Sequence, residues 1–213
     1  RRRLGLGDGP VLLSPRILRP LYNIHLIVEA MPSILAVRAD AVLLISRHRE
    51  DQEYATKLRQ RVSDLGIERS VLFIEPVSYD DMPGLLSTTS VVISVPFSDG
   101  LPQTLFESVA SQTPIVLGRL GAYEEIVQDD REVLLTDLAS PSIAAAVSRL
   151  LTEPELARRL QEAGLKRIKE TASLKDEARR VDFMYRKILA KPRRSSPLVP
   201  RILDAMSLAF RRG

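Results

Sequence analysis

Short apolar runs alternate with segments of helical periodicity along most of the chain. The runs are rich in Val, Ile and Leu and contain few polar positions, which is typical of strands that a sheet buries on both faces. This pattern predicts strands at residues 11–14, 41–45, 71–74, 91–95, 114–117 and 133–135.

Segments with helical spacing follow the predicted strands in turn. Gly66 is expected to end a charged, exposed helix, since glycine is the usual residue just beyond a helix. The predicted helices cover residues 21–37, 51–65, 80–87, 105–111, 123–127, 142–151, 154–171 and 174–190. Strands that alternate with helices form right-handed βαβ units. We therefore expect an α/β fold with a doubly wound, mostly parallel sheet of about six strands, Rossmann-like, followed by C-terminal helices.

The residues from 191 onward break this pattern. Two prolines, two serines and three basic residues fill positions 191–197, a composition typical of linkers and tails. The sequence predicts a domain at 1–191 and a basic, apolar tail or cross-domain helix at 192–213. Two interpretations of the tail stay open. One is a frayed end or a helix docked on a neighbour, and the other is an amphipathic segment on an anionic membrane.

Composition and charge narrow the classes of function. The net charge of +4 is concentrated at the two ends and only 5% of the residues are aromatic, so nucleic-acid binding is not expected. There is no cysteine for a disulfide or a thiolate metal site, and His25 and His48 have no partners at metal-ligand spacing. No apolar run is long enough to cross a membrane. The lack of cysteine fits a reducing compartment, and we expect no metal and no cofactor.

Residues 99–107 hold the clearest candidate chemistry. Asp99 follows the predicted strand at 91–95, and Glu107, eight positions later, lies in the first turn of the helix predicted at 105–111. In a parallel α/β sheet this turn lies at the carboxyl edge, where ligands bind. Free backbone N–H groups and the positive end of the helix favour an anion there.

The order of features along the chain resembles the C-terminal, sugar-donor-binding domain of a GT-B glycosyltransferase, and most of all glycosyltransferase family 4 (glycosyl transferases group 1). Asp99 and Glu107 match the family's E-x7-E signature, with aspartate for the first glutamate. Arg16 stands at the place of the family's phosphate-contacting arginine. The other matching passages are Glu29-Ala30, 65–67 with 71–74, 79–86, 111–116 with Gln112 in place of a glycine, and 121–127.

The resemblance implies an enzyme that binds a nucleotide-diphosphate sugar and transfers the sugar, with retention, to an acceptor hydroxyl. It assigns Glu107 to the ribose hydroxyls and Asp99 to a hydroxyl of the transferred sugar, as the catalytic pair. The candidates for binding the phosphates are Arg16, Arg19, Gly100, Gln103, Thr104 and Leu105. Positive groups there stabilise the charge that develops on the departing phosphate, and this scheme requires no metal.

Three departures from the family pattern keep other interpretations open. Leu21-Tyr22-Asn23 replaces a lysine followed by glycine, Ser46-Arg47-His48 replaces a glycine-rich strand end, and Pro102 replaces a glycine. The alternative function is a non-catalytic nucleotide-sugar-binding or regulatory module, and a third is another doubly wound enzyme, such as a sugar-nucleotide epimerase. The simpler roles for the site residues are an ion pair for Arg16, a turn for Asp99, a solvent-facing position for Glu107 and a helix cap for Thr104.

A GT-B enzyme has two Rossmann-like domains with the active site between them. The resemblance therefore implies an N-terminal acceptor domain, or a separate chain, as a partner besides the nucleotide sugar. By analogy it also suggests polysaccharide or glycolipid assembly in the cytoplasm, with peripheral contact at the inner membrane face through the tail.

Overall fold

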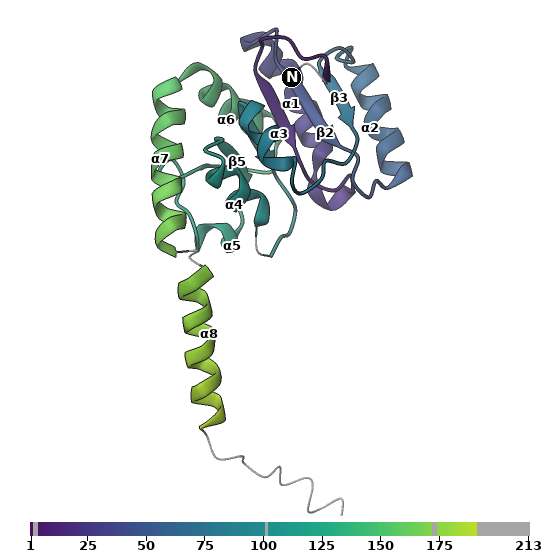
Figure 1. Ribbon diagram of the computed structural model, residues 1–213. Helices are drawn as coiled ribbons and strands as arrows, with labels where there is room; N and C mark the ends of the chain where they lie inside the picture. The colour runs from purple at the N-terminus through teal and green to yellow at the C-terminus, as the bar shows by residue number, and fades with distance from the viewer. Residues whose placement is uncertain (2–3, 101, 172–173, 191–213) are drawn as a thin grey trace, which may run out of the picture. The chain divides into compact units, whose positions relative to one another are not determined.

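The computed structural model describes residues 1, 4–100, 102–171 and 174–190 (Figure 1). The chain divides into two compact units, Arg1–Thr171 and Ala172–Gly213. The first is an α/β domain, and the described part of the second contains the helix α8 (Leu174–Leu189). The predicted tail at 192–213 lies outside the described residues, so the domain boundary near residue 191 and the membrane contact of the tail stay predictions.

Parallel strands form one six-stranded sheet in the order β3-β2-β1-β4-β5-β6, which confirms the predicted fold class. The apolar runs explain the burial, since β1, β4 and β5 are buried at every position. The chain order reverses between β1 and β4, and ligands of such folds bind beyond the carboxyl ends of the strands at this point. The strands are β1 (Val11–Ser14), β2 (Val42–Ser46), β3 (Val71–Ile74), β4 (Val91–Ser94), β5 (Ile115–Gly118) and β6 (Leu134–Thr136).

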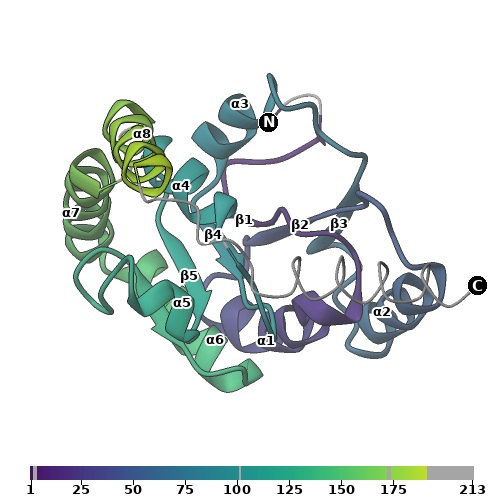
Figure 2. The same ribbon diagram turned by 90° about the horizontal axis from the view of Figure 1, so that it is seen from below.

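Helices cover both faces of the sheet (Figure 2). Ile27 and Val147 belong to the core beneath α1, α2 and α6, whereas Leu105 and Tyr123 belong to the core beneath α3, α4 and α5. Among the described residues, no helix is both long and apolar enough to span a membrane. The helices are α1 (Ile24–Val37) after a short 3-10 helix (Pro20–Tyr22), α2 (Gln52–Asp64), α3 (Met82–Thr88), α4 (Gln103–Ala110), α5 (Gly121–Glu124), α6 (Ser140–Thr152) and α7 (Pro154–Thr171).

Two helices near the candidate site begin two residues earlier than the sequence predicts. Pro102 takes the N-cap position of α4, where its missing N–H costs no intrahelical hydrogen bond, so the helix begins at Gln103. In α5 the N–H groups of Tyr123 and Glu124 both donate to the carbonyl of Leu120, which closes the first turn already at Gly121. The earlier start of α4 makes the N–H groups of Gln103 and Thr104 the first of that helix, and the earlier start of α5 places Tyr123 in its first turn, where its hydroxyl contacts Asp99.

The helices α2 and α4 end in the same way. The N–H groups of Gly66 and Gln112, and of the residue after each, donate to carbonyls in the last helical turn. Gly66 has a φ of 65° and Gln112 a φ of 51°, so both lie in the left-handed region. Glycine adopts this conformation freely, whereas a residue with a Cβ is strained in it. The predicted helix end at Gly66 is confirmed, and Gln112 occupies a position whose backbone favours glycine.

We predict that Gln112→Gly raises the free energy of unfolding by about 1 kcal/mol, because it removes the left-handed strain. The carbonyl of Gln112 keeps the hydrogen bond that it accepts from the Gln161 side chain (2.6 Å), since that contact uses only the backbone. The matched variant is Gly66→Gln, whose added Cβ meets no atom within 4 Å and which should therefore lose stability through the backbone alone. Urea denaturation measures both changes, and equal stability of the three proteins would contradict this account.

Candidate functional site

An ion pair joins the loops that follow β1 and β4, the two strands at the point where the sheet order reverses. Arg16 Nη2 lies 3.0 Å from Asp99 Oδ2, and the exposed fractions of the two side chains are only 13% and 15%. Water screens such a pair less than it screens a pair on the open surface. The structure thus brings together Arg16 and Asp99, two of the predicted site residues, at the carboxyl edge of the sheet.

Two further contacts fix the guanidinium of Arg16. Its carbon lies 4.4 Å from the centre of the Tyr22 ring, and its Nη1 donates to the hydroxyl of Thr104 at 3.3 Å. The cation lies over the negative face of the ring, an attraction that adds to the ion pair with Asp99. The suggested role of Thr104 as a helix cap is wrong, because Pro102 is the N-cap and the Thr104 hydroxyl serves Arg16 instead.

Both oxygens of the Asp99 carboxylate are held. Oδ1 accepts the N–H of Gly100 at 3.0 Å, and Oδ2 accepts the hydroxyl of Tyr123 at 2.7 Å in addition to Arg16. Burial of Tyr123, then its hydrogen bond to Asp99 and the charge of that carboxylate, raise the pKa of the Tyr123 hydroxyl, so it remains a proton donor. Asp99 has therefore more partners than a turn residue needs. The sequence interpretation missed Tyr123, although it lies within the passage 121–127 that carries part of the resemblance.

Glu107 lies one turn into α4 and is half-buried. Burial raises the pKa of its carboxyl, and the charge of Arg16 lowers it in part, so the two groups are close enough to interact. Within the described part of the chain, this carboxylate accepts no hydrogen bond, so both of its oxygens remain available to hydroxyl groups.

The first N–H groups of α4 point toward the same edge. Those of Gln103 and Thr104 have no acceptor within the described ranges, as expected for the start of a helix. The N–H of Leu105 donates to the carbonyl of Pro102 (2.9 Å), and the Leu105 side chain belongs to the core. The predicted role of Leu105 in phosphate binding would therefore need that hydrogen bond to be given up.

The remaining predicted phosphate ligands are less well placed. The N–H of Gly100 is already used by Asp99. Arg19 is exposed, and in the described residues its guanidinium has no ion pair or hydrogen bond. The structure thus leaves the guanidinium of Arg16 and the backbone N–H groups of Gln103 and Thr104 as the donors near Asp99 and Glu107.

Residues 21–23, which replace the expected lysine and glycine, connect the two loops of the site. Asn23 has a φ of 49°, a left-handed conformation like that of a glycine. Its side-chain amide donates to the carbonyl of Val95 (3.0 Å), and the carbonyl of Leu21 accepts the N–H of Phe97 (2.8 Å). This segment contributes no cation, but it holds the loop after β1 against the loop after β4.

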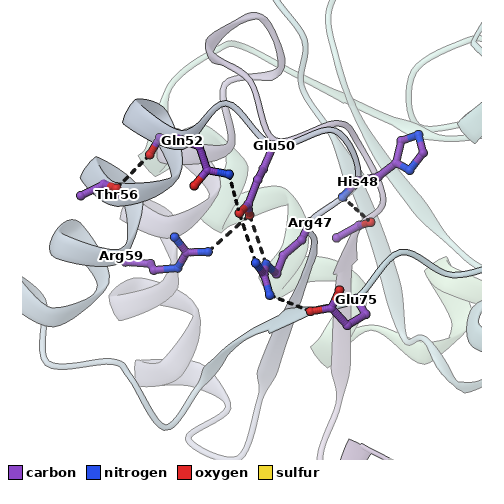
Figure 3. A network of polar contacts seen from close by, with 8 residues as sticks. Arg47, His48, Glu50, Gln52, Thr56, Arg59 and Glu75 are labelled. Carbon is purple, nitrogen blue, oxygen red and sulfur yellow. Dashed lines mark hydrogen bonds and ion pairs between the residues drawn. The ribbon is translucent and has the colours of Figure 1, made fainter.

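A charged network supports the loop after β2, where Ser46-Arg47-His48 replaces the glycine-rich strand end (Figure 3). Glu50 accepts from Arg47 (3.1 Å) and Arg59 (3.3 Å), and Arg47 also pairs with Glu75 (2.6 Å). The hydrogen bond from Arg47 is the main reason that the pKa of Glu50 is lowered.

This loop is also tied to the loop of Arg16 through the backbone. The N–H of Leu18 donates to the carbonyl of His48 (3.4 Å), and the carbonyl of Leu18 accepts the N–H of Asp51 (2.9 Å). The charged network therefore supports the main chain that positions Arg16.

The comparisons with known proteins place this arrangement in a family. Residues 1–167 match the family described as glycosyl transferases group 1, and the chain belongs to it. YtcC of Bacillus subtilis, a protein named as a glycosyltransferase, is 26% identical over 205 residues, which are 92% of this chain and 50% of YtcC. D-inositol 3-phosphate glycosyltransferase of Acidothermus cellulolyticus is 33% identical over 163 residues, 71% of this chain and 36% of that enzyme. The chain thus spans half or less of the length of these relatives.

Solved structures support the fold. The Anabaena protein Alr3699/HepE, crystallised with UDP and glucose, superimposes with a TM-score of 0.79 at 16% identity, covering 88% of this chain and 51% of that one. The C-terminal domain of the glycosyl transferase group 1 family protein LpcC from Francisella tularensis gives a TM-score of 0.71 at 19% identity. That match covers 79% of this chain and 88% of the LpcC domain. The Rossmann-like half of a GT-B fold is therefore shown.

We predict that Glu107→Gln raises the free energy of unfolding at pH 7. The folded chain raises the pKa of Glu107 above its usual value of 4.5, so it holds this proton more tightly than the unfolded chain does. Ionisation of Glu107 therefore costs stability as the pH rises through and above that value. The gain should vanish at lower pH, where the wild-type carboxyl is protonated in both states.

Chemical denaturation at pH values from about 3 to 7 measures this difference. The control is Glu53→Gln, which removes an exposed carboxylate paired with Lys57 on α2 (2.6 Å) and should give no gain at pH 7. A Glu107→Gln protein that is less stable than wild type at pH 7 would show that the attraction of Arg16 outweighs the burial of the charge.

Proposed function

We propose that the chain is the sugar-donor-binding domain of a retaining GT-B enzyme of glycosyltransferase family 4, and that it binds a nucleotide-diphosphate sugar above β1 and β4. The observation that carries the proposal is the convergence of Arg16, Asp99 and Glu107 with the start of α4 at one edge of the sheet. The family supports glycosyl transfer, and the crystallised complexes of Alr3699/HepE with UDP and with UDP-glucose support a nucleotide sugar as the ligand.

In this proposal the diphosphate lies at the start of α4. The free N–H groups of Gln103 and Thr104 and the positive helix end bind its oxygens, and the guanidinium of Arg16 adds a fork of donors. Negative charge grows on the departing phosphate as the bond to the sugar breaks. Groups fixed in advance around that phosphate stabilise the transition state more than the bound substrate, and no metal is needed for this.

The two carboxylates bind the two ends of the substrate. Glu107 has no hydrogen bond in the described residues and accepts the ribose hydroxyls, two donors for one carboxylate. Gly100 uses one lone pair of Oδ1 of Asp99, and Tyr123 and Arg16 use Oδ2, so a lone pair of Oδ1 remains to accept a hydroxyl of the transferred sugar.

The rest of the active site is proposed to come from a second Rossmann-like domain. The acceptor hydroxyl would bind there, either in the same protein or in a separate chain, and would attack the sugar across the crevice. Polysaccharide or glycolipid assembly in the cytoplasm, peripherally at the inner membrane face, is the setting that we propose for the reaction.

One observation favours a second candidate, a nucleotide-sugar-binding module without turnover. Leu21-Tyr22-Asn23 stands where the resemblance expects a lysine followed by glycine, so the diphosphate has one cation fewer. Nucleotide-sugar binding that is never followed by release of the nucleoside diphosphate, when acceptor and acceptor domain are supplied, would favour this module over the enzyme.

We predict that the chain binds UDP or GDP and the matching nucleotide sugars, and that Glu107→Ala and Arg16→Met each weaken this binding about tenfold or more, the size of one lost charged hydrogen bond. Titration calorimetry at fixed ionic strength gives the affinities. Glu53→Ala on the exposed side of α2 is the matched control and should bind like wild type. Absence of binding at millimolar ligand, or unchanged affinity of Glu107→Ala, would overturn the proposal.

A further inference from the structure

Two donors, the Tyr123 hydroxyl and the Arg16 guanidinium, contact the same oxygen of Asp99, and only one of them is also proposed to bind the ligand. Oδ2 accepts the Tyr123 hydroxyl at 2.7 Å and Arg16 Nη2 at 3.0 Å. Under the proposed function Arg16 also binds the diphosphate, which carries more negative charge than a carboxylate. The guanidinium must then share its N–H groups between two anions, so its contact with Asp99 weakens when the ligand binds.

Tyr123 has no such second task. It is fully buried, in the core cluster that includes Leu105 and Leu117, and its N–H donates to the carbonyl of Leu120 (2.8 Å). A ring packed in this way keeps its hydroxyl at Asp99 whichever anion Arg16 contacts. Its hydroxyl remains protonated, because burial and the neighbouring carboxylate both favour the neutral form.

We infer that Tyr123 is a positioning residue for recognition of the transferred sugar, an inference that rests on the proposed function. Its hydroxyl keeps Oδ2 of Asp99 in place while Arg16 engages the diphosphate, so the remaining lone pairs of the carboxylate stay directed at a sugar hydroxyl. Tyr123 touches neither the diphosphate nor the ribose in this arrangement. Its hydroxyl therefore contributes to binding of the sugar and not to binding of the nucleotide.

Tyr123→Phe removes the hydroxyl and retains the buried ring, which separates positioning from packing. The quantity to measure is the ratio of two dissociation constants, for a nucleotide sugar and for the nucleoside diphosphate alone, using UDP-glucose and UDP or the corresponding GDP pair. We expect Tyr123→Phe to raise this ratio about tenfold, the effect of one hydrogen bond to a charged group, with the affinity for the diphosphate within about twofold of wild type.

The matched control is Tyr54→Phe, which removes a half-buried hydroxyl that accepts the N–H of His25 (3.0 Å) on the other core cluster. It should leave the ratio unchanged. In the Asp99→Asn background, Tyr123→Phe should have little further effect on the ratio, because both changes act on the same group.

The outcomes separate this inference from the function on which it rests. If wild type binds neither nucleotide nor nucleotide sugar, the proposed function fails and this inference fails with it. If wild type binds both and Tyr123→Phe weakens both equally, the hydroxyl is structural only. An unchanged ratio, or full effects of Tyr123→Phe in the Asp99→Asn background, would also overturn the positioning role while leaving the proposed function intact.

Discussion

The pair of Arg16 and Asp99 is the interaction on which the candidate site depends, and the strand order makes it possible. β1 and β4 are neighbours in the sheet, although α1, β2, α2, β3 and α3 lie between them in the sequence. The loops after these strands therefore meet, and a charge from each is held with little exposure to water. A shielded charge that lacks partners is costly, so the site needs further donors. Tyr123 and the N–H of Gly100 supply them to the carboxylate, while Tyr22 and Thr104 hold the guanidinium.

The site retains features that are unfavourable for folding alone and suited to a ligand. Glu107 is half-buried without a hydrogen-bond donor among the described residues, and the first N–H groups of α4 have no acceptor there. Local conflicts of this kind tend to collect where a protein binds or reacts. Hydroxyl donors placed at Glu107 and an anion placed at α4 would satisfy both groups at once. The unpaired groups at this edge therefore match the hydroxyls and the diphosphate of a nucleotide sugar, the ligand of the proposed function.

The sequence predicts the fold well because the signals for the sheet are local. Runs of Val, Ile and Leu bounded by helical periodicity identify the strands to within one residue at each end, whereas several helix ends differ by two or three residues, as in α5. Asp99 and Glu107 are predicted from their place around the turn after the strand at 91–95, whereas Arg16 is predicted through the resemblance to the family. Tyr123 and Tyr22 are not found, because their contacts come from α5 and from the 3-10 helix before α1, which only the folded chain brings to Asp99 and Arg16. Gln112 is different, because the sequence alone already pointed to this position. The resemblance expects a glycine there, and the structure has a left-handed backbone at Gln112, which favours glycine.

The segment at 21–23 decides how far the family's chemistry extends to this chain. A lysine there would add a mobile positive charge, whereas Tyr22 offers only the face of its ring to Arg16. The ring cannot neutralise a phosphate, but it keeps the guanidinium at the edge of the sheet, and Asn23 ties the same segment to the carbonyl of Val95. Compared with the expected lysine, the segment at 21–23 lacks a positive charge but holds the guanidinium of Arg16 and the loop after β4 in place. Under the proposed function, Arg16 is the side-chain cation fixed beside the start of α4, so stabilisation of a departing diphosphate would depend more heavily on the N–H groups of that helix.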